Sequence, residues 1–228
     1  MRCWGVWALF CLAGNCRGFT VRPGSAARPF GARSFSRAGT RREAESLPSC
    51  VVFDLDGCLW SPEMYELSWM GGGPPFKLEG KADGRILDRS GNPIKLLGDV
   101  REVLRQLHCD ERWDGVLVGI SSRTDEPGWA RSLLKCFQFT HSGEDISLDD
   151  VFQFEEIAYD YKEQHFRRIA KKTGLPFEAM LFFDNEPGNC RDVAELGVTV
   201  GYCPGGVDLD IWNRALAAFP APAGEVVK

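Results

Sequence analysis

The sequence lacks an apolar run of membrane-spanning length. A transmembrane helix needs roughly 18 or more apolar residues, and the apolar stretch at residues 3–13 (CWGVWALFCLA) is too short. Hydrophobic residues still make up 44% of the 228-residue chain, which is enough for a packed core and argues against a wholly disordered protein. We therefore expect a folded domain with no integral membrane segment in the mature form.

The nine cysteines have no C-x-x-C spacing and no neighbouring His cluster. Structural zinc sites usually carry such spacings, so we expect none. Several cysteines lie on apolar faces, where Cys usually acts as a small hydrophobic residue. The pattern indicates no disulfide framework and favours a reducing final compartment.

Lysine is missing from the first fifty residues, which hold eight Arg and two acids, a net charge of +6. The remaining residues hold 19 basic and 30 acidic groups, a net charge of −11. An acidic body offers no basic patch, so we expect no nucleic-acid partner. Such a body is compatible with a divalent-metal site, because these sites collect carboxylates.

Residues 1–49 are typical of a targeting presequence. The stretch 3–13 has the size of a signal-peptide core, and residues 19–42 contain Arg, Ser, Ala, Gly and Pro but no acid, as organelle transit peptides do. A signal core followed by Phe19 and an Arg/Ser-rich segment resembles the two-part presequence of plastids bounded by extra membranes. We expect a plastid location, with secretion or a mitochondrial destination as alternatives.

The body alternates apolar runs with amphipathic segments. We expect strands at about 50–56, 115–120, 151–157, 179–183 and 198–202, and helices at 99–109, 127–137, 160–173, 187–196 and 208–219. This alternation predicts an α/β fold with a mainly parallel sheet and helices on both faces. The expected domain covers residues 50–220, and residues 221–228 are expected to form a C-terminal tail.

Residues 57–98 show no long apolar period and contain the turn-rich segments 71–75 (GGGPP) and 88–93 (DRSGNP). We expect a loop or small flap there and no large cap domain. Its aromatic residues either stack on a substrate ring or pack the flap onto the body. These residues are Trp60, Tyr65, Trp69 and Phe76.

Three acids lie at strand ends. Asp54 and Asp56 follow the first apolar run, and Asp184 follows the run at 179–183. Ligands of parallel α/β folds bind at the carboxyl ends of the strands, so we expect these acids to converge there if their two strands are neighbours. Their oxygens suit Mg²⁺, and Asn185 and Asn189 could hold its waters. The alternatives are solvated acids in a turn and a helix N-cap at Asp184.

Close carboxylates repel each other unless a cation lies between them or one holds a proton. A metal-bound Asp54 would suit a nucleophile, and a protonated Asp56 would suit an acid. Ser122 could bind phosphate oxygens at the end of its strand. Lys162 opens a helix, where the dipole disfavours a cation, and this suggests a partner anion. Alone, the Ser122 and Lys162 signals are weak, because such residues are common.

The motifs occur in a defined order, namely VVFDLDGCLW at 51–60, SSRT at 121–124, Lys162 at a helix start and FFDNEPGN at 182–189. This order resembles the haloacid dehalogenase (HAD) superfamily of aspartate-nucleophile phosphohydrolases, and more closely its magnesium-dependent phosphatase-1 family. The resemblance covers about Val51 to Tyr202. It implies a three-layer Rossmann-like fold with a minimal cap and Mg²⁺-dependent hydrolysis of phosphomonoesters.

By this resemblance, Asp54 is the nucleophile that forms an aspartyl-phosphate, and Asp56 protonates the leaving oxygen and then activates water. The phosphoryl oxygens are held by Ser122, Arg123 and Lys162, and Mg²⁺ by Asp54, the backbone carbonyl of Asp56 and Asp184, with Asn185 and Asn189 as possible outer partners. These roles are coherent, because phosphoryl transfer needs in-line positioning and neutralised phosphoryl charge.

Two positions depart from the family pattern. Cys58 replaces the Thr of D-x-D-x-T, so a hydroxyl hydrogen bond is lost or replaced by a weak thiol one. Asn185 stands where the family often has a second acid, which removes a charge beside the metal. These departures motivate the alternative of a non-catalytic phosphate- or protein-binding module. A phospho-acceptor signalling domain is a third reading, against which the D-x-D spacing argues.

The resemblance implies a phosphorylated substrate, either a small molecule such as a sugar phosphate or a phosphoprotein such as one carrying phosphotyrosine. A site with little cap is open and accepts both. We expect the protein to be a monomer.

Overall fold

The computed structural model describes residues 46–81 and 84–228. Most of the expected presequence therefore lies outside the described residues. Within the described part of the chain, no helix is long and apolar enough to cross a membrane.

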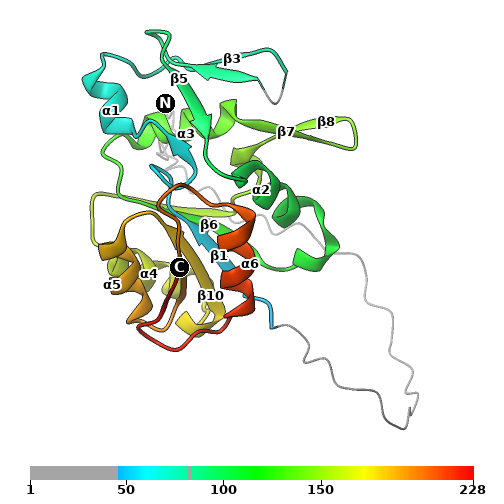
Figure 1. The fold of residues 1–228 in the computed structure, drawn as a ribbon, viewed down its shortest axis with the longest axis vertical. Helices are drawn as coiled ribbons and strands as arrows, with labels where there is room; N and C mark the ends of the chain where they lie inside the picture. Colours follow the sequence, from blue (N-terminus) through cyan, green and yellow to red (C-terminus); the bar gives the residue numbers. More distant parts are fainter. Residues whose placement is uncertain (1–45, 82–83) are drawn as a thin grey trace, which may run out of the picture. The chain divides into compact units, whose positions relative to one another are not determined.

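A six-stranded sheet forms the centre of the fold, in the order β12-β11-β10-β1-β6-β9 (Figure 1). All of its pairings are parallel, which confirms the predicted sheet type. The strands are β1 (Cys50–Phe53), β6 (Leu117–Ser122), β9 (Phe154–Ile157), β10 (Met180–Asp184), β11 (Thr199–Tyr202) and β12 (Val226–Val227). The central strand β1 is buried along its whole length, as its continuous apolar sequence predicts.

Helices cover both faces of this sheet, as predicted. They are α2 (Val100–Cys109), α3 (Pro127–Cys136), α4 (Lys162–Thr173), α5 (Pro187–Ala194) and α6 (Leu209–Ala217). Side chains of β1 alternate between two cores, because successive residues of a strand point to opposite faces. Val51 and Phe53 pack with α2, α3 and α6, whereas Val52 packs with α4 and α5. Gly174 ends α4 with φ 73°, a left-handed conformation that glycine adopts without strain.

The segment 57–98, which was expected to be a loop or small flap, is a small subdomain with secondary structure of its own. It contains β2 (Trp60–Ser61), α1 (Met64–Trp69), β3 (Lys77–Glu79), β4 (Arg85–Leu87) and β5 (Pro93–Leu96), and its antiparallel sheet has the order β2-β5-β4-β3. Strands of two to four residues are too short to show an apolar period. The turn joining β4 to β5 is closed by Asp88, whose Oδ1 accepts backbone N–H bonds from Ser90 and Asn92, each 2.8 Å long.

Two further elements differ from expectation. A hairpin of β7 (Gln138–His141) and β8 (Glu144–Ser147) follows α3, where the sequence analysis expected none. The expected tail 221–228 contains β12, which pairs with β11 and extends the main sheet beyond residue 220. Both pairings depend on contacts between short segments, which leave little periodicity in the sequence. Three short 3₁₀ helices complete the structure, at Glu111–Trp113, Leu148–Asp150 and Phe177–Ala179.

The register of the central strands brings the predicted site residues to one edge. Phe53 pairs with both Phe183 and Ile120, so the three strands end at nearly the same level. The Asp54 backbone N–H continues the ladder by donating to the Phe183 carbonyl at 2.9 Å. The residues that follow these strand ends therefore face a common space.

Candidate active site

A pocket of about 260 Å³ lies at this carboxyl edge. Every site residue that the sequence analysis named lines it, except the fully buried Asp184. The subdomain 57–98 contributes Glu63 and Tyr65 to the wall. The topology therefore brings together all four motif segments, as expected from their places at strand ends and at the start of a helix.

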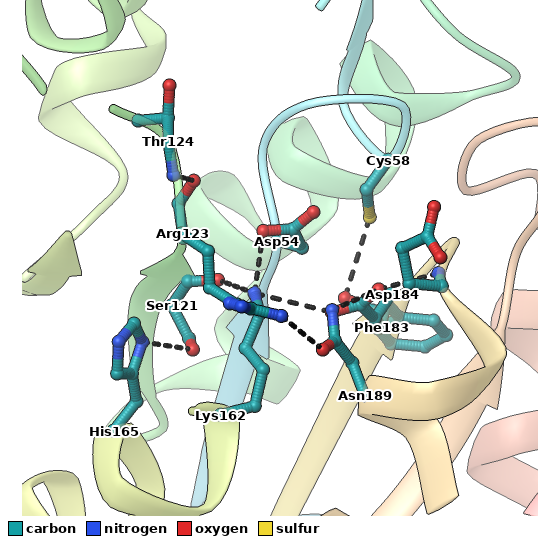
Figure 2. A network of polar contacts seen from close by, with 12 residues as sticks. Asp54, Cys58, Ser121, Arg123, Thr124, Lys162, His165, Phe183, Asp184 and Asn189 are labelled. Atoms are coloured by element: carbon teal, nitrogen blue, oxygen red, sulfur yellow. Dashed lines mark hydrogen bonds and ion pairs between the residues drawn. The ribbon is translucent and has the colours of Figure 1, made fainter. Parts of the chain in front are cut away.

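Lys162 joins two carboxylates at the floor of the pocket (Figure 2). Its ammonium nitrogen lies 2.6 Å from Oδ1 of Asp54 and 3.3 Å from Oδ2 of Asp184, and it also donates to the backbone carbonyl of Ser121. The Lys162 side chain is 1% exposed. Because one nitrogen contacts both carboxylates, Asp54 and Asp184 lie close enough to share one cation. The anionic partner that the position of Lys162 suggested is thus this pair of acids.

One ammonium group does not offset two buried carboxylates. Burial raises the pKa of Asp54 to about 7, although Lys162 acts to lower it, and the charge of Asp184 adds to the rise. Burial acts to lower the pKa of Lys162, but Asp54 and Asp184 hold it above its ordinary value. The cluster therefore retains excess negative charge, which a divalent cation would neutralise.

The carboxylate oxygens of Asp184 and the amide oxygen of Asn185 are also suitable ligands for Mg²⁺. Oδ1 of Asp184 accepts the Glu186 backbone N–H at 2.7 Å, and Oδ2 accepts the Asn189 amide at 3.1 Å. The buried Oδ1 of Asn185 has no hydrogen-bond partner and can act as a ligand or hold a ligand's water. No three His, Cys, Asp or Glu side chains of the described chain form a ready metal cluster. The ligand set would thus include amide, backbone and water oxygens, as is usual for Mg²⁺.

Asp56 points toward the subdomain 57–98. Its Oδ1 accepts the Trp60 indole N–H at 2.8 Å and the Met64 backbone N–H at 3.2 Å. Burial raises the pKa of Asp56, and these hydrogen bonds offset only part of the rise. A raised pKa favours a carboxyl group that can carry a proton, the property an acid catalyst needs.

Ser122 and Arg123, which were predicted together with Lys162 to hold phosphoryl oxygens, line the pocket, whereas the ammonium group of Lys162 is paired with Asp54 and Asp184. The Ser122 hydroxyl oxygen accepts the Thr124 backbone N–H at 3.3 Å. Arg123 donates from Nη1 to Oδ1 of Asn189 at 3.4 Å, so Asn189 connects Arg123 to Asp184. The buried Nε of Arg123 has no hydrogen-bond partner within the protein and remains able to donate to an anion.

The sequence analysis missed a pair that holds Lys162 in place. The Ser121 hydroxyl lies 3.0 Å from Nδ1 of His165, and Nε2 of His165 lies 3.1 Å from the Ala158 carbonyl. A carbonyl only accepts, so Nε2 carries the proton and Nδ1 accepts from Ser121. Burial lowers the pKa of His165 to about 4, which keeps the ring neutral. His165 lies three residues after Lys162 on the same helix face, and this spacing is the feature of the sequence that could have indicated its role.

Cys58 lies in the turn that follows Asp56, and its side chain is buried. Its thiol donates to the Phe183 carbonyl at 3.5 Å and lies 3.5 Å from the thiol of Cys203. The hydroxyl bond of the family pattern is thus replaced by a weak thiol bond. The described cysteines are all free, in agreement with the expectation of no disulfide framework.

Gly57 permits a close approach at the same loop. A Cβ atom on Gly57 would lie 2.3 Å from the Asn185 amide nitrogen, so no larger residue fits without displacing Asn185. Its φ of 71° also favours glycine. The loop between Asp56 and Cys58 is thereby held against the segment that follows β10.

Comparisons with known proteins agree with this geometry. The family model described as Acid Phosphatase matches residues 46–221. The human protein named Magnesium-dependent phosphatase 1 is 36% identical over 175 residues, which cover 76% of this chain and 88% of that protein. A HAD-like hydrolase superfamily protein of Schizosaccharomyces pombe is 31% identical over 152 residues, which cover 67% of this chain and 83% of that protein. The chain belongs to the acid phosphatase family, within the HAD-like phosphatases.

Solved structures with the same fold share little sequence. The phosphatase-domain part of the Bacteroides fragilis protein BF1531, solved with Mg, has a TM-score of 0.51 and 19% identity over 80% of this chain and 43% of that chain. A HAD family enzyme from Bacteroides thetaiotaomicron, solved as a magnesium complex, has a TM-score of 0.51 and 15% identity. The match covers 74% of this chain and 100% of that chain. At these identities the likeness concerns the fold, and it agrees with the predicted HAD-like architecture.

Proposed function

We propose that the protein is a Mg²⁺-dependent phosphomonoester hydrolase in which Asp54 forms an aspartyl-phosphate. The observation that carries this proposal is the convergence of Asp54 and Asp184 on one cation at the floor of a pocket that also presents Ser122 and Arg123. Carboxylates around a cation, together with donors for phosphoryl oxygens, are what phosphoryl transfer to an aspartate requires.

The metal would be held by Asp54, Asp184 and oxygens contributed by the Asp56 carbonyl and Asn185. When bound, Mg²⁺ supplies charge neutralisation that lets an anionic carboxylate approach an anionic phosphate. Ser122 and Arg123 orient the phosphoryl oxygens by donating hydrogen bonds to them. Lys162 keeps Asp54 aimed into the pocket by holding its Oδ1.

In the first step, an oxygen of Asp54 forms a bond to phosphorus as the ester P–O bond breaks. The proton of Asp56 passes to the leaving oxygen, which departs as a neutral alcohol or phenol. In the second step, Asp56 accepts a proton from water, and the water oxygen attacks phosphorus. The bond from phosphorus to Asp54 then breaks, which releases inorganic phosphate and restores the carboxylate.

The substrate that we propose is a phosphomonoester, either a protein phosphotyrosine or a small sugar phosphate. The relative in human is named for a magnesium-dependent phosphatase activity, which supports the reaction type. The alternative of a non-catalytic binding module rests on Cys58, which replaces the usual Thr, and on Asn185, whose amide lacks the charge of the acid often found there.

The test is hydrolysis of an aryl phosphate with and without Mg²⁺. Wild-type activity should depend on Mg²⁺, and Asp54→Asn should lower kcat by roughly a thousandfold or more, because an amide is a poor nucleophile. The exposed Asp114→Asn is the matched control and should keep wild-type activity. Full activity in Asp54→Asn rejects the mechanism, whereas phosphate binding without any turnover supports the binding module.

We further propose plastid targeting by residues 1–49 and a monomeric mature protein. Fusion of residues 1–49 to a fluorescent protein tests the first proposal, and a secreted or mitochondrial fusion contradicts it. Sedimentation of protein starting near residue 45 tests the second.

A further inference from the structure

The exposed large hydrophobic residues of the described chain belong to two segments, each of which contributes one residue to the lining of the active-site pocket. They are Tyr65, Trp69, Met70, Tyr159 and Tyr161. The first three belong to α1 and its C-cap, and the last two to the loop between β9 and α4. Tyr65 and Tyr159 both line the pocket. We call the four aromatic residues among these five, Tyr65, Trp69, Tyr159 and Tyr161, the aromatic rim.

Part of the aromatic rim lies beyond the pocket. Trp69 is 83% exposed and Tyr161 is 67% exposed, and neither lines the pocket. Trp69 meets the Tyr65 ring edge-on at 5.1 Å between ring centroids, so the aromatic surface continues from the wall outward. A small ester held within about 260 Å³ would not cover this surface. A longer substrate would, and exposed aromatic surface beside a site commonly marks such a contact.

The charged side chains that line the pocket favour a cationic partner. Beyond the catalytic acids, the pocket is lined by Glu63, Asp125 and Glu186, and its lining cations are Arg123 and Lys162. Lys162 is buried between carboxylates. The guanidinium of Arg123 lies 5.8 Å and 6.0 Å from the ring centroids of the two rim tyrosines of the β9–α4 loop.

The negative charges of nearby carboxylates affect the pKa of Tyr65. Glu63 is the main cause of the raised pKa of Tyr65, and Glu66 and Glu186 add to it. A bound divalent cation and a phosphate dianion have opposite charges, so they largely cancel each other. The negative charges of Glu63, Asp125 and Glu186 are therefore left to attract the parts of the substrate that flank the phosphate.

Carboxylates beside aromatic rings recognise ammonium and guanidinium groups through ion pairing and cation–π contacts. We infer that the aromatic rim selects phosphorylated polypeptide segments in which Lys or Arg flanks the phosphorylated residue. This inference rests on the proposed phosphatase function and names the substrate context for the same site.

The experiment uses three phosphopeptides of equal length with the same phosphotyrosine, flanked by Lys, Ala or Glu. We expect kcat/KM for the Lys peptide to exceed that for the Glu peptide by about tenfold at low salt. The ratio should shrink at high salt, because exposed charges are screened.

Variants locate the effect. Asp125→Asn combined with Glu186→Gln should lower the Lys-to-Glu ratio by roughly fivefold, since it removes two exposed carboxylates at the pocket. Glu144→Gln combined with Asp149→Asn removes two exposed acids of the β8 region and should leave the ratio unchanged. Tyr159→Phe should preserve the preference for Lys, whereas Tyr159→Leu should reduce it, because only the ring offers a cation–π contact.

The outcomes separate the two proposals. Equal kcat/KM for the three peptides, or a preference for Glu, overturns the inference and leaves the phosphatase function standing. Hydrolysis of small phosphates but of no peptide also overturns it. Failure to hydrolyse any phosphate ester removes the proposed function, and the inference with it.

Discussion

The ammonium group of Lys162 and the carboxylate of Asp54 form a buried ion pair with a separation of 2.6 Å, although the two residues are 108 positions apart in sequence. Asp184 shares the same ammonium group at 3.3 Å. This pair fixes the direction of the Asp54 carboxylate before any metal or substrate arrives. It also makes the stability of the site depend on one cation.

Replacement of Lys162 by Met should lower the free energy of unfolding by about 3–5 kcal/mol, because two carboxylates would remain buried without their cation. Added MgCl₂ should restore part of the loss, since a divalent cation can neutralise both acids. Urea unfolding with and without MgCl₂ measures both effects.

The matched control is Lys95→Met, which changes an exposed lysine of β5. It should alter the free energy of unfolding by less than about 0.5 kcal/mol. A Lys162→Met protein as stable as this control would contradict the buried ion pair.

Removal of the Asp56 acid should affect substrates according to their leaving groups. For Asp56→Asn, we expect a loss of about 10²–10⁴ in kcat/KM with alkyl phosphates, whose leaving oxygen needs a proton. An aryl phosphate with an acidic phenol should still react with Asp54 and release one equivalent of phenol in a burst. Stopped-flow kinetics checks this, and equal losses for both substrate types would count against Asp56 as the acid.

His165 should make stability depend on pH. Burial lowers its pKa from 6.5 to about 4 in the folded protein, so between these values only the unfolded state takes up the proton. Its contribution to the free energy of unfolding is therefore present above pH 6.5 and falls as pH decreases toward 4, by on the order of 3 kcal/mol.

The measurement compares wild type with His165→Asn by urea unfolding from pH 7 to pH 4. Asn does not titrate, and its amide oxygen can accept from the Ser121 hydroxyl. Other titrating groups act equally on both proteins, so the difference between the two curves should shrink as pH falls. Parallel curves would show that His165 titrates normally in the folded state.

The thiol of Cys58 can be tested with an isosteric pair. Thr and Val at position 58 have nearly the same shape, but only Thr can donate to the Phe183 carbonyl, which Cys58 contacts at 3.5 Å. Cys58→Thr should therefore be more stable than Cys58→Val by about 1 kcal/mol. Thermal unfolding of the two variants measures the difference, and equal stability would mean that the carbonyl needs no donor there.

Several elements could be predicted from sequence because their signals are local. The continuous apolar runs of β1 and β10 are typical of buried parallel strands, and Gly174 marks the end of α4 through its own conformational freedom. The alternation of strands and helices, together with the acids at the strand ends, then predicted where the site would be. Comparisons support the family that the motif order suggested.

Other elements could not be predicted because their stabilising contacts are distant or brief. The antiparallel sheet of 57–98 and the β7–β8 hairpin consist of strands of two to four residues, below the length at which alternation is detectable. The strand β12 forms only because β11 offers an open edge beside it. The roles of Ser121 and His165 depend on the packing of α4 against β6.

The sequence by itself determined that carboxylates, a serine and a lysine would lie at strand ends or at a helix start of a parallel sheet, since the apolar runs and the polar residues that end them are local features of the chain. Only the tertiary structure decided that Lys162 pairs with Asp54 and Asp184, that Asp56 faces the subdomain 57–98, and that exposed aromatic residues line part of the pocket. These relationships depend on distances between segments far apart in sequence, and such distances are set by strand register and helix packing.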